Sequence, residues 1–113
     1  MGHEKLYVGI DIGGTNTKIA LISQKGEITD LRRLINKEID LTIGNFLNLI
    51  TFEIQTILGS ELSLVNGIGI STPGFQRTDG HGTLLSINMP ILNNVDLKEY
   101  FETRTGLPVN VHN

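Results

Sequence analysis

A short segment near the start of the chain carries the residues best suited to chemistry. Asp11 is followed, after one residue, by Gly13, Gly14 and Thr15, and Lys18 comes three residues later. Glycines leave backbone N–H groups bare, so these groups and the Thr15 hydroxyl can face phosphate oxygens. A carboxylate beside such a turn suits hydrated Mg²⁺, which prefers carboxylate and phosphate oxygens and keeps several waters. The segment therefore predicts a nucleotide phosphate site, with Asp11 orienting Mg²⁺ through water and Lys18 within reach of a phosphate.

The spacing of this segment excludes two common phosphate loops. The dinucleotide fingerprint Gly-x-Gly-x-x-Gly opens a helix, whereas the residues after Gly14 favour a strand. A Walker A loop ends in Gly-Lys-Ser/Thr, but Lys18 follows a threonine. On these residues alone one alternative stays open. It is a plain β-hairpin turn, with Asp11 bonded to its own turn and Lys18 in solvent.

The elements that must position this turn follow from the spacing of apolar residues. Residues 6–12, 17–22 and 28–35 favour three antiparallel strands in a meander, with the glycine turn between the first two. Apolar residues recur at helical spacing over 41–58, which predicts a helix with one buried face. Gly59 is a suitable stop for that helix.

The second half of the chain indicates parallel strands joined by crossovers. Residues 67–71 read as a buried strand, and 109–112 begin a last one. Between them, Asp96 and Glu99 resemble a capping box, which predicts a short helix over 97–105. The fold class is therefore α/β, with the order β-β-β-α-β-α-β and a mixed five-stranded sheet that has a meander on one side and right-handed crossovers on the other.

Composition narrows the class of protein. At 113 residues, 39% of them hydrophobic, the chain is long enough for one compact domain with a core. It has no cysteine, which excludes disulfides, thiolate metal sites and a catalytic thiol. The net charge of −3, without runs of like charge, argues against nucleic acid and anionic membranes as partners. The first residues have no signal-peptide pattern, so we expect a cytoplasmic protein.

Four segments resemble the ROK family of sugar kinases, which belongs to the sugar kinase, Hsp70 and actin superfamily. Residues 8–16 resemble its first phosphate motif and residues 67–74 its strand leading into a Pro-Gly turn. Residues 86–90 resemble its Asn-Leu-Pro segment, and residues 106–113 its Gly-Leu-Pro-Val-x-Val-x-Asn strand. Order and spacing agree along essentially the whole chain. The resemblance implies a ribonuclease H-like, actin-like ATPase domain over 1–113, with the family's C-terminal domain absent.

The resemblance also implies a sugar site. Pro73 and Gly74 would form one wall through backbone groups, and Asn88 and Asn113 would pair with sugar hydroxyls, because an amide offers two donors and an acceptor. In the family an Asp acting as general base follows the last Asn. The base is therefore expected just after Asn113, no catalytic residue is assigned within this chain, and the family's zinc site lies outside it. Taken without the resemblance, Pro-Gly marks an ordinary turn, and a loop Asn usually caps nearby backbone.

The implied activity is that of an ATP-dependent kinase that phosphorylates a hexose or an N-acetylhexosamine, with ATP and Mg²⁺ as cofactors. The 113 residues would form its N-terminal part and be inactive alone. The alternative is the sugar-sensing domain of a ROK-family transcriptional repressor, although only five residues precede the first strand, too few for a DNA-binding module. A heat-shock or actin-like ATPase shares the hairpin but gives no reason for the Pro-Gly and Asn-Met-Pro segments.

Some residues depart from the family pattern or invite other assignments. Arg77 stands where an acidic or amide residue is common, and residues 91–94 replace a Gly-Trp segment. Both are expected near the sugar pocket and leave the identity of the sugar open. His81 and His112 are expected to be exposed or hydrogen-bonded rather than metal ligands or bases. We also expect a homo-oligomer, with self-association through an unprotected strand edge at 109–113.

Overall fold

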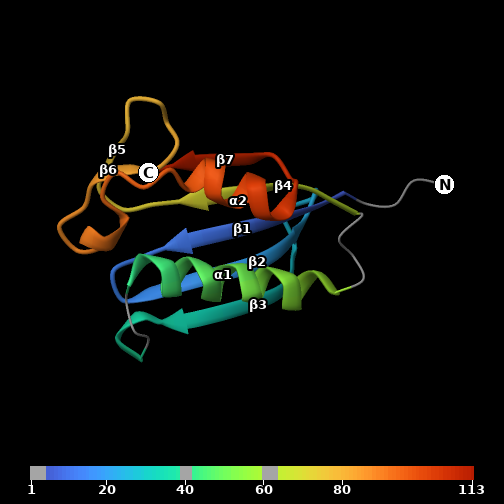
Figure 1. The fold of residues 1–113 in the computed structure, drawn as a ribbon. Coiled ribbons are helices and arrows are strands. Elements are labelled where there is room, and N and C mark those ends of the chain that lie inside the picture. The colour runs from blue at the N-terminus through green and yellow to red at the C-terminus, as the bar shows by residue number, and fades with distance from the viewer. Residues whose placement is uncertain (1–4, 39–41, 60–63) are drawn as a thin grey trace.

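The computed structural model describes residues 5–38, 42–59 and 64–113. Within these residues, five strands form the main sheet in the order β3-β2-β1-β4-β7 (Figure 1). β2 pairs antiparallel with β1 and β3, whereas β4 pairs parallel with β1 and β7. The predicted mixed sheet is thus confirmed. The strands are β1 (Leu6–Ile12), β2 (Asn16–Ser23), β3 (Ile28–Ile35), β4 (Val65–Ser71) and β7 (Val109–His112).

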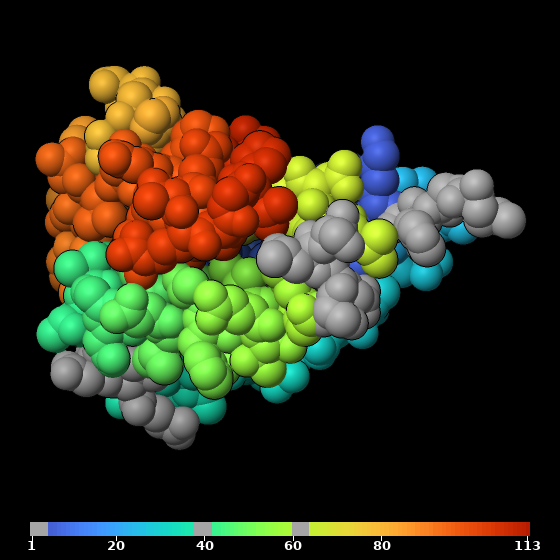
Figure 2. All heavy atoms as spheres, turned by 45° about the vertical axis from the view of Figure 1, so that its right-hand side comes forward, coloured from blue at the N-terminus to red at the C-terminus, as the bar shows by residue number. Residues whose placement is uncertain are grey.

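The alternation of side chains along β1 separates the two faces of the sheet. Val8 and Ile10 are buried, whereas the Asp11 side chain belongs to the opposite face. Ile10 lies opposite Ile19 of β2 and Ile70 of β4, so these three residues share the buried face. Both helices, α1 (Ile43–Leu58) and α2 (Leu97–Thr105), cover that face, as Figures 1 and 2 show. The core therefore lies between helices and sheet, and the Asp11 face carries no helix of the described residues.

Capping residues set the ends of the two helices close to the predicted positions. The Thr42 side chain accepts a hydrogen bond from the Asn45 amide at the start of α1, and Gly59 ends that helix. Leu41, the first residue of the predicted helix, lies outside the described residues. At α2 the Asp96 carboxylate accepts from the Glu99 amide at 2.9 Å, so this half of the expected capping box is present. Across the described ranges, no helix is both long and apolar enough to cross a membrane.

The structure contains a small hairpin after β4 and two short turns that the sequence did not predict. β5 (Phe75–Gln76) and β6 (Thr83–Leu85) pair antiparallel beside the C-terminus of the chain (Figure 1). Single 3₁₀ turns, η1 (Asn36–Glu38) and η3 (Pro90–Leu92), follow β3 and the hairpin. Strands of two and three residues are too short to show a period of two, so apolar spacing could not reveal them.

The expectation of an unprotected edge at β7 is wrong. β7 is an edge strand, but side chains of this chain bond its outward backbone groups. The Val109 amide donates to Glu102 at 3.0 Å, and its carbonyl accepts from Lys98. The Val111 carbonyl accepts from the Gln76 side-chain amide at 2.8 Å. Since an edge strand associates through free backbone groups, these bonds oppose pairing with a second copy at this strand.

Candidate functional site

Tight space, rather than an unusual backbone angle, explains Gly13 in the turn between β1 and β2. The Gly13 amide donates to the Asn16 carbonyl at 2.9 Å, and a Cβ on Gly13 would lie only 3.0 Å from that oxygen. A Cβ on Gly14 would lie 3.4 Å from the Cβ of Asn88. Neither glycine has a positive φ. The predicted phosphate turn is therefore closed by its own backbone and lies directly beside Asn88, one of the predicted sugar residues.

Asn36, which the sequence analysis did not identify as a site residue, holds this turn through hydrogen bonds from the helix-covered side of the sheet. Only 1% of its surface is exposed. Its side-chain amide donates to the carbonyls of Gly13 at 2.7 Å and of Gly14 at 3.1 Å. Its side-chain oxygen accepts from the Thr17 hydroxyl at 3.2 Å. No motif marks this residue, because it follows β3 and reaches the turn only when β3 pairs with β2.

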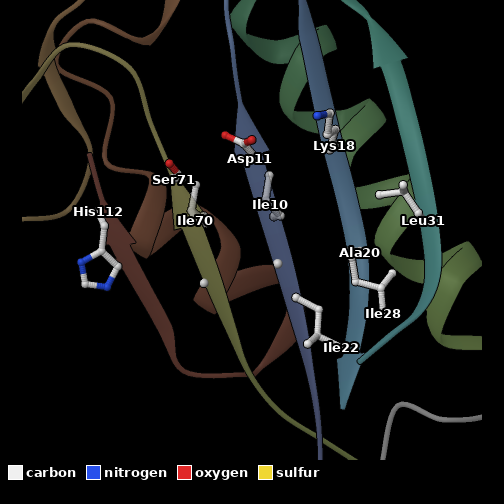
Figure 3. A pocket seen from close by; sticks show the side chains of 12 residues that line it. Ile10, Asp11, Lys18, Ala20, Ile22, Ile28, Leu31, Ile70, Ser71 and His112 are labelled. Carbon is white, nitrogen blue, oxygen red and sulfur yellow. The ribbon is translucent and has the colours of Figure 1, made fainter. Parts of the chain in front are cut away.

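Asp11 and Lys18 lie on the helix-free face, directly opposite one another in the antiparallel pair. Together with Ser71 and His112 they line the polar part of a hollow of about 370 Å³, whose remaining lining is largely apolar (Figure 3). In the part of the chain that the structure describes, neither the Asp11 nor the Lys18 side chain has a hydrogen-bond or ion-pair partner. The alternative in which Asp11 bonds its own turn therefore has no support in the hydrogen bonds of this site.

The four predicted sugar residues come together at the ends of β4 and β7. Pro73, Gly74 and Asn88 line one pocket of about 200 Å³. The Asn113 side-chain amide donates to the Gly74 carbonyl, which brings the end of the chain to the same wall. The backbone of Gly74 is left-handed, with φ +86°, a conformation that glycine adopts without strain. Phe75 and Leu85 of the β5–β6 hairpin also line the pocket, as does Ile87, which follows the hairpin and is 89% exposed.

Arg77 lies two residues after Phe75, a lining residue of this pocket, but does not itself line it. Its guanidinium donates to the Asp79 carboxylate at 2.7 Å and to the Asn94 carbonyl at 3.3 Å, which ties the hairpin to the loop before α2. His81 is hydrogen-bonded, as predicted: its Nδ1 lies 3.0 Å from an Asp96 oxygen and 3.5 Å from an Asp79 oxygen. These contacts hold the loop in place and lie away from the phosphate turn.

The carboxylates of this loop are stabilised in their charged form. The hydrogen bond from the His81 amide, helped by Arg77, holds the pKa of Asp79 below its ordinary value. Burial alone would raise the pKa of Asp96, but the hydrogen bond from the Glu99 amide and the nearby His81 outweigh it, so this pKa is also lowered. Both groups therefore act as structural anions.

Comparison with known proteins agrees with this geometry. The ROK family sequence model matches residues 7–113. A glucokinase of Halalkalibacterium halodurans is 31% identical over 113 residues, which span 97% of this chain and 34% of that protein. The chain thus spans about a third of the length of the curated relatives it matches.

Solved structures show the same fold. A ROK family glucokinase from Streptomyces griseus, in complex with glucose and AMPPNP, superposes with a TM-score of 0.72 at 25% identity, covering 96% of this chain and 33% of that one. A ROK family transcriptional regulator, a homolog of E. coli MLC, superposes with a TM-score of 0.77 at 22% identity, covering 96% of this chain and 27% of that one. The likeness confirms the predicted actin-like ATPase fold. The regulator's likeness is one of fold alone.

Proposed function

The chain belongs to the ROK family, and on this premise we propose that it is the N-terminal, actin-like ATPase domain of an ATP-dependent sugar kinase acting on a hexose or an N-acetylhexosamine. One observation carries the proposal. The phosphate turn and the predicted sugar pocket are adjacent, because a Cβ on Gly14 would lie 3.4 Å from the Cβ of Asn88. Transfer of a phosphoryl group requires the acceptor hydroxyl beside the terminal phosphate, and such positioning supplies much of the catalysis.

The donor set at the turn fits a magnesium nucleotide. Asp11 offers a carboxylate that has no partner among the described residues, and it lies two positions before Gly13, on the helix-free face. The Gly14 and Thr15 amides and the Thr15 hydroxyl would bind phosphate oxygens. Asp11 would hold Mg²⁺ through water, and Lys18 would add a positive charge near the phosphates. Mg²⁺, when bound, would neutralise charge on the phosphate oxygens.

The residues of the proposed sugar pocket would bind and orient the sugar. Asn88 lies beside the turn, with its Cβ 3.4 Å from the position of a Cβ on Gly14. Pro73 and Gly74 form a rigid wall, since the Thr83 hydroxyl donates to the Pro73 carbonyl at 3.2 Å. The Asn113 amide bonds the Gly74 carbonyl, which leaves its oxygen and second N–H for a sugar hydroxyl. We assign the chain no general base. The residues named here bind and orient both substrates.

The test is ADP formation by the full-length protein with a panel of hexoses and N-acetylhexosamines. We expect sugar-dependent turnover, and Asp11→Asn should lower kcat by about 10- to 100-fold, the usual cost of losing an outer-shell group that orients a metal. Sugar affinity measured by calorimetry should be unchanged, because Asp11 is assigned to the phosphate side. Asp79→Asn is the matched control, because Asp79 lies on the loop between β5 and β6 and lines neither the hollow beside Asp11 nor the proposed sugar pocket. It should keep the wild-type kcat.

Two results would contradict the proposal. Sugar binding without ADP formation, for every sugar in the panel, would favour the sensor domain of a repressor. A folded Asp11→Asn variant that loses sugar affinity while keeping kcat would mean that Asp11 belongs to the sugar half of the site.

A further inference from the structure

We infer that Asn36 is a positioning residue for the nucleotide: its buried side chain holds two carbonyls of the turn so that the Gly14 and Thr15 amides face the phosphates. The inference rests on the proposed function, because it assigns these amides to ATP. It goes beyond that function by giving a role to a residue that lies in a different element and does not itself contact a substrate.

Most hydrogen bonds of the Asn36 side chain go to the turn region. Its amide nitrogen donates to two successive carbonyls, those of Gly13 and Gly14, and also lies 3.7 Å from the Met89 sulfur. Its oxygen accepts from the Thr17 hydroxyl, which fixes which end of the amide faces the turn. The Asn36 backbone amide donates to a third carbonyl, that of Thr15, at 2.9 Å. One residue therefore binds the carbonyls of three consecutive residues.

This arrangement dictates where the amides of the turn point. The described peptide bonds are all trans, and in a planar trans peptide the C=O of one residue and the N–H of the next point in opposite directions. Because Asn36 draws the Gly13 and Gly14 carbonyls toward itself, the N–H groups of Gly14 and Thr15 point away from it. Among the described residues, neither of these amides donates a hydrogen bond. The turn thus presents two adjacent free donors, the arrangement that binds an anion.

The free amides and Asp11 point toward the same side of the sheet. Thr17 is fully buried and lies opposite Ile12, which places it on the helix-covered face. Asn36 contacts Thr17 and therefore holds the turn from that face. The opposite direction, taken by the two amides, is that of the helix-free face, to which the Asp11 carboxylate belongs. Asn36 accordingly aligns the anion-binding donors with the residue assigned to Mg²⁺.

The side chain at this position must donate hydrogen bonds to the turn carbonyls and accept one from the Thr17 hydroxyl, and asparagine does both. Aspartate has the same shape but only acceptors, so it would set a carboxylate against two carbonyl oxygens. The Asn36→Asp variant therefore removes the two donations with little change in volume. Asn48→Asp is the control substitution of the same type. The Asn48 side-chain oxygen accepts a hydrogen bond from the Tyr100 hydroxyl at 3.0 Å, and a carboxylate oxygen can accept the same bond.

The test uses the full-length protein and compares ATP with sugar. We expect Asn36→Asp to raise the KM for ATP about tenfold or more, from the loss of two hydrogen bonds to the turn. Sugar affinity by calorimetry should stay within about twofold of wild type, because Asn36 does not line the proposed sugar pocket and, in the segment that holds Asn88, bonds only the sulfur of Met89, the next residue. Asn48→Asp should leave both quantities unchanged.

A second measurement does not depend on the folding of the variant. In the isotope-labelled wild-type protein, AMPPNP should shift the NMR resonances of the Gly14 and Thr15 amide protons, as formation of new hydrogen bonds requires. Binding of AMPPNP that leaves both resonances in place would overturn the inference. So would a folded Asn36→Asp variant with an unchanged KM for ATP, or one in which ATP and sugar affinity fall equally. A wild-type protein that binds no nucleotide at all would refute the proposed function and this inference with it.

Discussion

Gly74 is the position where the proposed sugar pocket depends most on the absence of a side chain. Its φ is +86°, and a Cβ there would collide with the Leu85 carbonyl oxygen and lie 2.9 Å from the Ser86 Cα. The left-handed backbone costs a non-glycine residue roughly 1–2 kcal/mol. Displacing a packed backbone segment costs about 1–3 kcal/mol more. We expect Gly74→Ala to lower the free energy of unfolding by about 2–5 kcal/mol, the sum of these two costs. It should also weaken sugar binding, because the displaced residues line the pocket.

Substitutions at other glycines measure the backbone cost and the steric cost separately. Gly106 has φ +71° with no heavy atom near its Cβ position, so Gly106→Ala should show the backbone cost alone, roughly 1–2 kcal/mol. A Cβ on Gly82 would collide with the Val95 carbonyl oxygen, yet Gly82 has no positive φ, so Gly82→Ala should show the steric cost alone. Gly44, inside α1, has neither problem, and Gly44→Ala should be neutral or stabilise by up to about 1 kcal/mol.

Urea denaturation of the four variants gives the comparison. The loss for Gly74→Ala should approach the sum of the losses for Gly106→Ala and Gly82→Ala, because it combines both causes. If Gly74→Ala were no more destabilised than Gly106→Ala, the close approach of Leu85 would contribute nothing, and the wall of the pocket would be able to move. The reasoning about a rigid wall would then be refuted.

Two further predictions concern pH and the sheet edge. The lowered pKa values of Asp79 and Asp96 give stability that is present above the ordinary carboxylate pKa of about 4 and is lost as the pH falls through the lower folded values. Urea denaturation should therefore show falling stability below about pH 4, with a shallower fall in Asp96→Asn, which keeps the helix cap; an identical slope would contradict this. At β7, removing the bonds of Gln76 and Glu102 together, as a double alanine variant, should raise association measured by sedimentation, since it frees edge groups. Sedimentation identical to wild type at every concentration would mean that these side chains do not protect the edge.

The fold was predictable where local signals are long. The helix α1 shows four turns of apolar spacing, and α2 is framed by Asp96 and Gly106, so both were predicted within a residue or two. The small β5–β6 hairpin was not predicted. Its strands are held by contacts such as the Arg77 amide to the Gly82 carbonyl, at 2.8 Å, and the Asn94 amide to the Thr83 carbonyl, also at 2.8 Å. Such short pairings leave no periodic pattern in the sequence.

Some residues of the candidate site could be predicted from the sequence and others could not, and the difference has a physical cause. The glycines and Asp11 are adjacent in sequence, so their chemistry can be read from the chain itself. Asn36 lies 23 residues from Gly13, and its role exists only because β3 pairs with β2 in one register, with Asn16 opposite Ile35. A shift by one residue would turn its side chain to the other face of the sheet. The donors that we assign to the nucleotide are therefore set by the register of the meander as well as by the glycine turn, and the third strand belongs to the proposed phosphate site.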